Sequence, residues 1–347
     1  MSEQKEPVSF EVSYTLDVIT LLDLLLSGER TEDLEIIHYW EEQLSTGCEV
    51  ALNKIRKTLP KGESLVSLLI PLITADIEFN ELSLTELLKS PKYLVTQFKQ
   101  QVVGQTISKS YQKFLNKDLE RIIEPVKSVI KELERAKFKN YWLENRLPLI
   151  NQKLKTHLKV THDLKVIETL NEISLLQQHK RRCIYVVSFD FIELKYLPLF
   201  NHDLVVSTKL STQQILECIT EQFLFPIMIH KQIKRCIRTL KLEKDIERLL
   251  KQAKENYHDL GSYLEANVKL AYQTYLNEQL GICEKPYEYL GRYQFGVYKI
   301  SVFFYHYIKA NPKLNSDSVT DYLIKVVEEV ELNQIDQRFI TLMNQVL

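Results

Sequence analysis

The segment 183–229 reads CIYVVSFDFIELKYLPLFNHDLVVSTKLSTQQILECITEQFLFPIMI and contains the clearest strand and helix signals of the 347-residue chain. Its first part, Cys183–Phe189, is rich in β-branched and aromatic residues, which predicts a buried strand. After a loop, Leu204–Thr208 has the same character and predicts a second, short, edge-like strand. The segment therefore indicates a small sheet that is followed directly by a helix.

The helix after the second strand is expected to run from Thr212 to about Ile229. Ser211 and Gln214 match a capping box, which predicts a helix start at Thr212. Toward its end the helix becomes apolar on nearly every side, which is typical of a helix in the middle of a core. The apolar residues are Phe223, Leu224, Phe225, Ile227, Met228 and Ile229.

Upstream of this segment the chain is predicted to be mostly helical. Apolar and polar residues alternate over 8–16, which predicts a first strand with one buried face. Apolar residues at helical spacing then dominate, and the region 30–165 is predicted to form a helical lobe. Pro125 lies inside a long amphipathic stretch of this lobe and is expected to kink or break the helix.

Downstream, the region 180–280 is predicted to hold the core and 281–347 to form a C-terminal helical part. No repeat, low-complexity linker or change of composition marks a boundary, so a single domain over 1–347 is expected. The predicted fold class is mainly α with a small mixed β-sheet, α+β, around the helix at 212–229.

Composition argues against several classes of partner. The chain has 45 Lys plus Arg against 46 Asp plus Glu, so its net field favours neither nucleic acid nor a membrane surface. No run of apolar residues is long enough to cross a bilayer, and the polar, acidic first residues do not resemble a signal peptide. Five widely spaced cysteines without a CxxC pair indicate neither a disulfide framework nor a thiolate zinc site, and a reducing cytoplasm fits them best.

The order of strand, loop, edge-like strand and capped buried helix, with a glutamate on a later helix, resembles the catalytic half of a zincin metallopeptidase. More narrowly it resembles gluzincins, in which the buried helix carries HExxH, often followed by proline. The resemblance implies that two histidines of that helix and a later glutamate bind zinc, while the first glutamate polarises a zinc-bound water.

In this sequence the corresponding helix reads EQFLFP, from Glu221 to Pro226. Glu221 and Phe225 stand at the two histidine positions, Gln222 stands at the general base, and Glu265 matches the later glutamate. A register one residue earlier would keep Glu221 as the base but also lacks both histidines. One carboxylate cannot form the three-ligand site of a catalytic zinc, and glutamine is no general base. The resemblance thus implies a relative with a degenerate motif and with neither metal nor cofactor.

The predicted function is that of a pseudo-metallopeptidase, a non-catalytic peptide- or protein-binding or regulatory module. The strand formed by Leu204, Val205, Val206 and Ser207 is expected to offer its edge to an extended peptide. Two alternatives stay open: a purely helical interaction scaffold, and a metal-dependent hydrolase with a displaced site. Candidate ligands for such a displaced site are Glu221, Glu265, His230 and His258.

Overall fold

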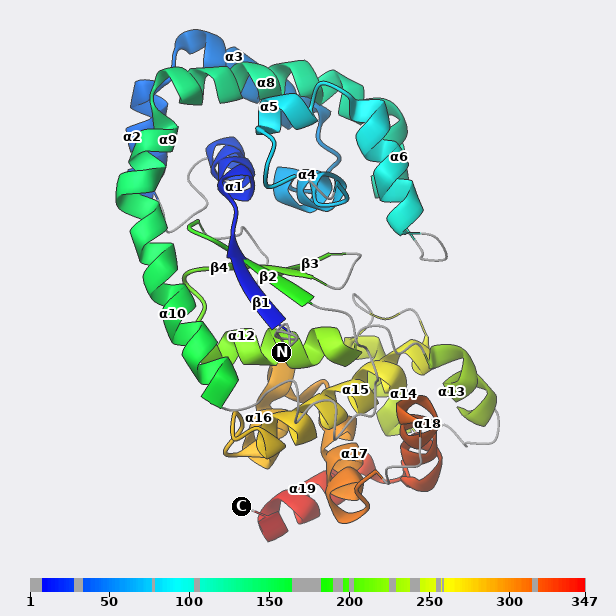
Figure 1. The fold of residues 1–347 in the computed structure, drawn as a ribbon. Helices are drawn as coiled ribbons and strands as arrows, with labels where there is room; N and C mark the ends of the chain where they lie inside the picture. The colour runs from blue at the N-terminus through cyan, green and yellow to red at the C-terminus, as the bar shows by residue number, and fades with distance from the viewer. Residues whose placement is uncertain are drawn as a thin grey trace, which may run out of the picture. The chain divides into compact units, whose positions relative to one another are not determined.

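The computed structural model describes residues 8–27, 34–76, 79–102, 107–163, 182–189, 196–199, 203–224, 229–237, 244–253, 257, 259–313 and 318–346. The fold is mainly α with a small mixed β-sheet, as predicted (Figure 1). Where the sequence suggests one domain, the folded chain divides into two compact units. Unit 1 comprises Met1–Val160 and Lys180–Thr212, and unit 2 comprises Thr161–His179 and Gln213–Leu347.

Unit 1 contains the described sheet, whose strands have the order β1-β2-β4-β3. The strands are β1 (Val8–Val12), β2 (Arg182–Val187), β3 (Tyr196–Pro198) and β4 (Leu204–Ser207). β2 pairs in parallel with both β1 and β4, and β3 runs antiparallel to β4. The prediction of β2 and β4 is confirmed, whereas β3, three residues long, was not predicted.

The first strand ends earlier than predicted. β1 stops at Val12, and the helix α1 (Tyr14–Ser27) begins two residues later, so the prediction of a strand over 8–16 is wrong in its second half. The Ser13 side chain accepts a hydrogen bond from the Leu16 N–H at 3.3 Å, which favours a helix start. Apolar residues at positions 14 and 16 fit a strand by alternation, but in a fully buried helix they fit equally well.

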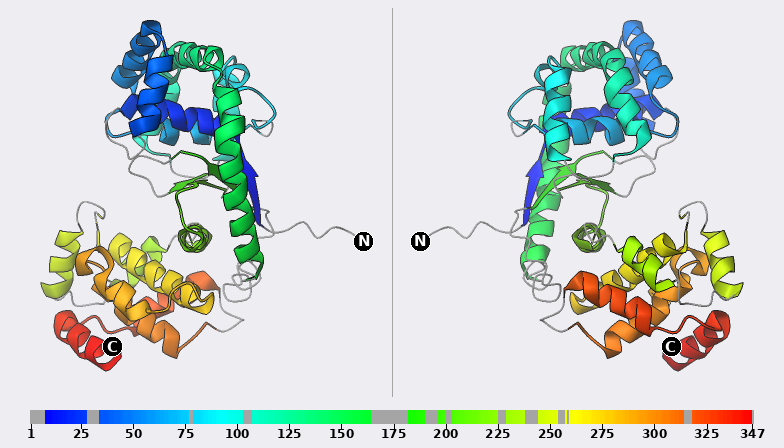
Figure 2. Two further views of the ribbon diagram at one scale, coloured as in Figure 1. Left: turned by 90° about the vertical axis from the view of Figure 1, so that its left-hand side faces the viewer. Right: turned by 90° about the vertical axis from the view of Figure 1, so that its right-hand side faces the viewer.

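The remaining helices of unit 1 form the predicted lobe, and α1 and α4 lie over one face of the sheet (Figures 1 and 2). On that face, Phe79 meets the ring of Tyr185 from β2 edge-to-face at 5.3 Å. The helices of unit 1 after α1 are α2 (Leu34–Gln43), α3 (Thr46–Thr58), α4 (Leu65–Ile73), α5 (Leu84–Leu87), α6 (Pro91–Gln101), α7 (Lys109–Lys113), α8 (Leu119–Arg135), α9 (Phe138–Tyr141) and α10 (Leu147–Asp163), with π-helical turns η1 (Phe114–Asp118) and η2 (Trp142–Arg146).

Pro125 does not break its helix. It is buried inside α8, which continues on both sides of it. Proline lacks the N–H that would bond the carbonyl four residues earlier, which here belongs to the exposed Arg121.

Unit 2 is helical throughout its described part. The long helix α15 (Leu260–Gln279) contacts α13, α16, α17 and α18, and buries Tyr263 and Tyr272 completely. The predicted central helix corresponds to α12 (Thr212–Leu224), while 225–228 lie outside the described residues. The other elements are α13 (His230–Ile237), α14 (Lys244–Gln252), α16 (Pro286–Arg292), the 3₁₀ turn η3 (Tyr293–Gly296), α17 (Lys299–Ala310), α18 (Val319–Glu329) and α19 (Ile335–Val346). Across the described part of the chain, no helix combines the length and apolar character needed to span a membrane.

Candidate functional site

The positions that resemble the peptidase motif lie on two helices of unit 2. Glu221 is exposed in the last turn of α12, and Glu265 lies on α15. The Glu265 carboxylate forms an ion pair of 2.7 Å with Lys269 one helical turn later. The side chain of Gln222 and the whole of Phe225 lie outside the described residues.

Two candidate ligands of the alternative metal site, the side chains of His230 and His258, also lie outside the described residues. Among the side chains that the structure does describe, no three His, Cys, Asp or Glu residues are grouped closely enough to hold a metal ion.

The expected peptide-binding edge at Leu204, Val205, Val206 and Ser207 is wrong. These residues form β4, which pairs with β2 on one side and with β3 on the other, and all four are buried. Their backbone groups face neighbouring strands on both sides, so β4 has no free edge for a peptide. The error follows from β3, because no pattern in the sequence indicates a strand that would cover β4.

The edge at β3 is poorly suited to bind a peptide. Leu199 N–H donates to the Asp203 carbonyl at 2.9 Å, in line with the pairing of Leu197 with Val205. Because bonded and non-bonded pairs alternate along antiparallel strands, the backbone groups of Tyr196 and Pro198 point away from β4. Proline has no N–H, so this edge offers few donors to a further strand.

Polar groups gather instead at the carboxyl ends of the parallel strands, where open α/β sheets commonly bind ligands. Asp17 lies in the first turn of α1, directly after β1, and is completely buried. Its carboxylate accepts hydrogen bonds from the Ser188 N–H (2.6 Å), the Ser188 hydroxyl (3.0 Å) and the Trp142 indole N–H (2.6 Å). Ser188 follows β2, and its carbonyl accepts a 3.3 Å bond from the hydroxyl of Thr208 after β4.

Burial is the main influence on the Asp17 carboxyl and raises its pKa to about 6. The hydrogen bonds from Trp142 and Ser188, and the positive charge of Arg146, act in the opposite direction. Asp17 is therefore a buried acid that is held mainly by neutral donors and that titrates close to neutral pH.

Arg146 is the cation of this site. Its guanidinium carbon lies 4.9 Å from the ring centre of Phe189, which is fully buried, and 5.8 Å from that of Tyr141. The Arg146 Nε is buried and has no hydrogen-bond partner among the described residues. The side chain as a whole is half-buried.

An aromatic cluster supports Arg146 and Asp17 from α2, α9 and η2. Trp40 meets Phe138 and Tyr141 edge-to-face at 5.0 and 5.1 Å, and Tyr39 stacks on Tyr141 at 5.8 Å. Within the described part of the chain the buried Trp40 indole N–H has no hydrogen-bond acceptor, so ring faces are the groups left to receive it. Trp40 and Phe138 are almost wholly buried, whereas Tyr39 is 47% exposed.

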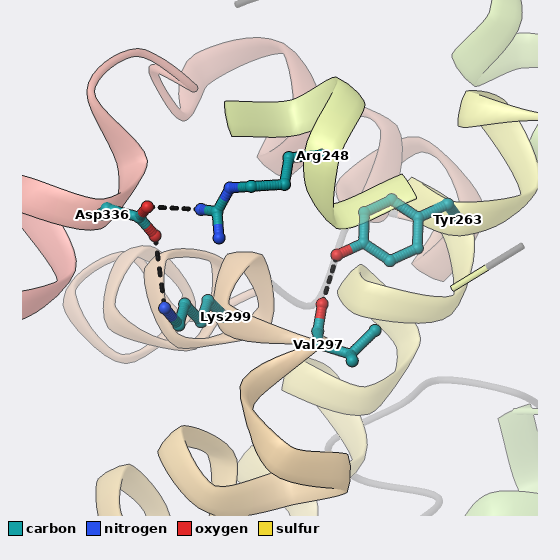
Figure 3. Close-up of polar contacts among 5 residues, drawn as sticks. All are labelled: Arg248, Tyr263, Val297, Lys299 and Asp336. Atoms are coloured by element: carbon teal, nitrogen blue, oxygen red, sulfur yellow. Dashed lines mark hydrogen bonds and ion pairs between the residues drawn. The ribbon is translucent and has the colours of Figure 1, made fainter. Parts of the chain in front are cut away.

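Unit 2 holds a different kind of polar cluster, shown in Figure 3. Asp336 of α19 pairs with Arg248 of α14 and, at 3.2 Å, with Lys299 of α17. Partial burial would raise the pKa of Asp336, but the bonds from Arg248 and Lys299 outweigh it and lower the pKa. Nearby, the Tyr263 hydroxyl donates to the carbonyl of Val297. These contacts connect α14, α17 and α19 near the surface and have no feature of a catalytic site.

Asp17, Trp142, Arg146 and Ser188 were not predicted from the sequence. One signal was available, because most of the other residues of α1 are apolar, and a charged residue in such a helix must be buried with partners. The partners lie more than a hundred residues away, and no spacing rule connects them to Asp17.

No protein-family model matches this chain, and neither curated protein sequences nor solved structures give a match.

Proposed function

We propose that this protein is a non-catalytic, zincin-like binding or regulatory protein that works without a bound metal and takes a peptide or protein segment as its partner. The mixed sheet argues against the purely helical scaffold. The edge of β4 is no part of this proposal, because β4 is covered on both sides.

The single observation that carries the proposal is the ion pair between Glu265 and Lys269 at 2.7 Å. Glu265 is the one position of the peptidase motif that keeps its residue type. An ammonium group one turn away neutralises the carboxylate and competes with any cation for it, and glutamate followed by lysine at i+4 favours this pair on a helix. The second carboxylate, Glu221, is exposed to solvent, where a charge needs no metal to be stable.

We further propose that the protein resides in a reducing compartment such as the cytoplasm. Among the cysteines whose side chains are described, Cys48, Cys183 and Cys283 are free thiols. Burial, the main influence on Cys48 and Cys183, raises the thiol pKa of both, which makes them small packing groups rather than nucleophiles.

Elemental analysis of the purified protein after dialysis against zinc tests the proposal. We expect the wild type, Glu265→Ala and Lys269→Ala to retain equal, background amounts of zinc. Glu278→Ala is the matched control, because Glu278 lies on the same helix and pairs with Lys309 at 2.7 Å. About one zinc per chain, lost in Glu265→Ala and kept in Glu278→Ala, would favour the metal-dependent hydrolase instead.

A further inference from the structure

We propose that Arg146 anchors a binding site for a carboxylate group, on a surface that continues over Tyr141 and Tyr39 and accommodates an aromatic or apolar group beside that carboxylate. The inference rests on the proposed peptide-binding function and names the chemistry that the bound segment must carry.

The orientation of Arg146 is fixed before any ligand binds. Its guanidinium lies over the rings of Phe189 and Tyr141, at 4.9 and 5.8 Å. Phe189 is fully buried, and the backbone of Arg146 belongs to the π-helical turn η2. Single π-helical turns within helices are frequent at functional sites. A guanidinium held in this way loses little conformational freedom when it binds a planar carboxylate.

The charge of Arg146 is unpaired among the described residues. Asp17 is close enough for its pKa to be lowered by Arg146, but its oxygens accept bonds from Trp142 and Ser188, and no described carboxylate forms an ion pair with Arg146. The Nε is buried without a partner in this part of the chain. A guanidinium has five N–H donors. The buried Nε is not accessible to a ligand, but the two Nη groups form no hydrogen bond with a described residue and can bind the two oxygens of a carboxylate.

The surface beside Arg146 has the composition of a binding hot spot. Tyr39 stacks on Tyr141, and the half-buried Tyr141 in turn contacts Arg146. Tyr39 is 47% exposed and Leu143, from the same turn as Arg146, is 45% exposed. Tyrosine and arginine dominate the energetics of protein interfaces, particularly where rigid packing supports them. Here Trp40 and Phe138 form a buried layer beneath the two tyrosines.

Charge favours a carboxylate over a phosphate. The Asp17 carboxylate is close enough to Arg146 for their charges to interact, and its negative charge repels a dianion more strongly than a monoanion. A single planar carboxylate matches the fork of the guanidinium. A phosphate dianion would need a second cation, and among the described residues no other cation lies over the rings of Tyr141 and Phe189.

Titration with N-acetylphenylalanine tests the site, because this probe places one carboxylate beside one aromatic ring. The readout is the ¹H–¹⁵N spectrum of the indole groups, since the chain has two tryptophans and Trp142 shares Asp17 with Arg146. A Trp40→Phe variant assigns the Trp142 signal. For about 15 non-hydrogen atoms we expect a dissociation constant of about 1 mM and a saturable shift of the Trp142 signal.

Three comparisons decide the chemistry. N-acetylphenylalaninamide, which lacks the carboxylate, and inorganic phosphate should each bind at least about tenfold more weakly than N-acetylphenylalanine, the difference that about 1.4 kcal/mol makes. N-acetyl-aspartyl-phenylalaninamide carries its carboxylate in a side chain, and its affinity relative to the first probe tells whether a chain terminus or an acidic side chain is preferred. Equal affinity for the amide, or tighter binding of phosphate, would overturn the inference.

Arg146→Met should weaken N-acetylphenylalanine binding about tenfold, and Arg146→Lys should lie between it and the wild type because lysine keeps the charge without the fork. Arg135→Met is the matched control, since Arg135 also lies in unit 1 but pairs with Glu132 at 2.7 Å. Two resolved indole signals and a far-UV circular dichroism spectrum like that of the wild type show that the free variants are folded. Wild-type affinity in Arg146→Met would contradict the site.

Failure of this inference can be told apart from failure of the proposed function. The zinc measurement concerns Glu265 in unit 2 and does not involve Arg146. If the probes do not bind but no zinc is retained, the carboxylate site is wrong and the metal-free assignment stands. If zinc is bound through Glu265 while the probes bind through Arg146, the reverse holds.

Discussion

Asp17 in unit 1 and Asp336 in unit 2 are both aspartates with several partners, yet their surroundings differ in kind. Asp17 is completely buried and is held by the neutral donors of Trp142 and Ser188, and burial raises its pKa to about 6. Asp336 is partly exposed, and Arg248 and Lys299 lower its pKa. The number of partners therefore does not predict the energetics of an acid. What matters is whether those partners are charged and whether water is near.

Replacing Asp17 by alanine should produce the largest effect. The Ser188 N–H and hydroxyl and the Trp142 indole N–H would be left buried without an acceptor, each at a cost of about 1 to 3 kcal/mol. We expect Asp17→Ala to lower the free energy of unfolding by about 3 to 5 kcal/mol. Denaturation followed by tryptophan fluorescence measures this, because Trp40 and Trp142 are the two tryptophans of the chain and both lie in unit 1.

The matched control is Asp17→Asn, which keeps the shape and a carbonyl acceptor for Ser188 but turns an amide toward Trp142. It should cost much less than alanine at neutral pH, since it removes a buried charge along with one hydrogen bond. Equal losses for Asp17→Ala and Asp336→Ala would show that Asp17 is no more important than a surface acid.

The second prediction concerns pH. The pKa of Asp17 is raised in the folded state to about 6, so the folded protein binds this proton more tightly than the unfolded chain, whose value is 3.8. Stability from this group is fully present below pH 3.8 and is lost as pH rises through 6. The difference between the two pKa values corresponds to at most about 3 kcal/mol.

Asp23, whose pKa burial also raises to about 6, has the same sign, so wild type alone does not isolate Asp17. The measurement is therefore the difference in unfolding free energy between wild type and Asp17→Asn at pH 4.5 and pH 8. Wild type should lose stability relative to Asp17→Asn as pH rises, and the Trp142 indole signal should titrate near pH 6. A difference that does not change with pH would mean that Asp17 does not titrate in this range.

Much of the fold was predictable because its signals are local. The β-branched runs of β2 and β4 mark buried strands, and the start of α12 at Thr212 agrees with the pattern after β4. The strand β3 has three residues and includes a proline, which is too little for any periodicity. Because β3 was not predicted, β4 was expected to be an edge strand that binds a peptide. In the structure β3 pairs with β4 and covers that edge.

The candidate site of unit 1 was not predictable for a different reason. Asp17, Trp142 and Ser188 are brought together by the parallel pairing of β1 with β2 and by the packing of η2 beside α1, across more than a hundred residues. The sequence indicates that an aspartate is buried in α1, but it does not indicate which donors satisfy it. The residues that resemble a zincin motif lie instead on α12 and α15, where Glu221 is exposed and Glu265 forms an ordinary ion pair with Lys269.

The smallest effect is expected for Asp336→Asn. Its partners Arg248 and Lys299 are partly exposed and regain water when the charge is removed, so the loss should be below about 1 kcal/mol. The sign of the pH dependence is opposite to that of Asp17, because a lowered pKa gives stability that is present above pH 3.8 and lost as pH falls through the lower folded value.

Salt should reduce the effect of Asp336→Asn and leave that of Asp17→Ala unchanged, since screening acts on exposed charges and not on buried hydrogen bonds. Unfolding followed by far-UV circular dichroism at low and high salt measures this, because unit 2 has no tryptophan. A large, salt-independent loss in Asp336→Asn would place Asp336 with Asp17, as a buried group that its unit needs in order to fold.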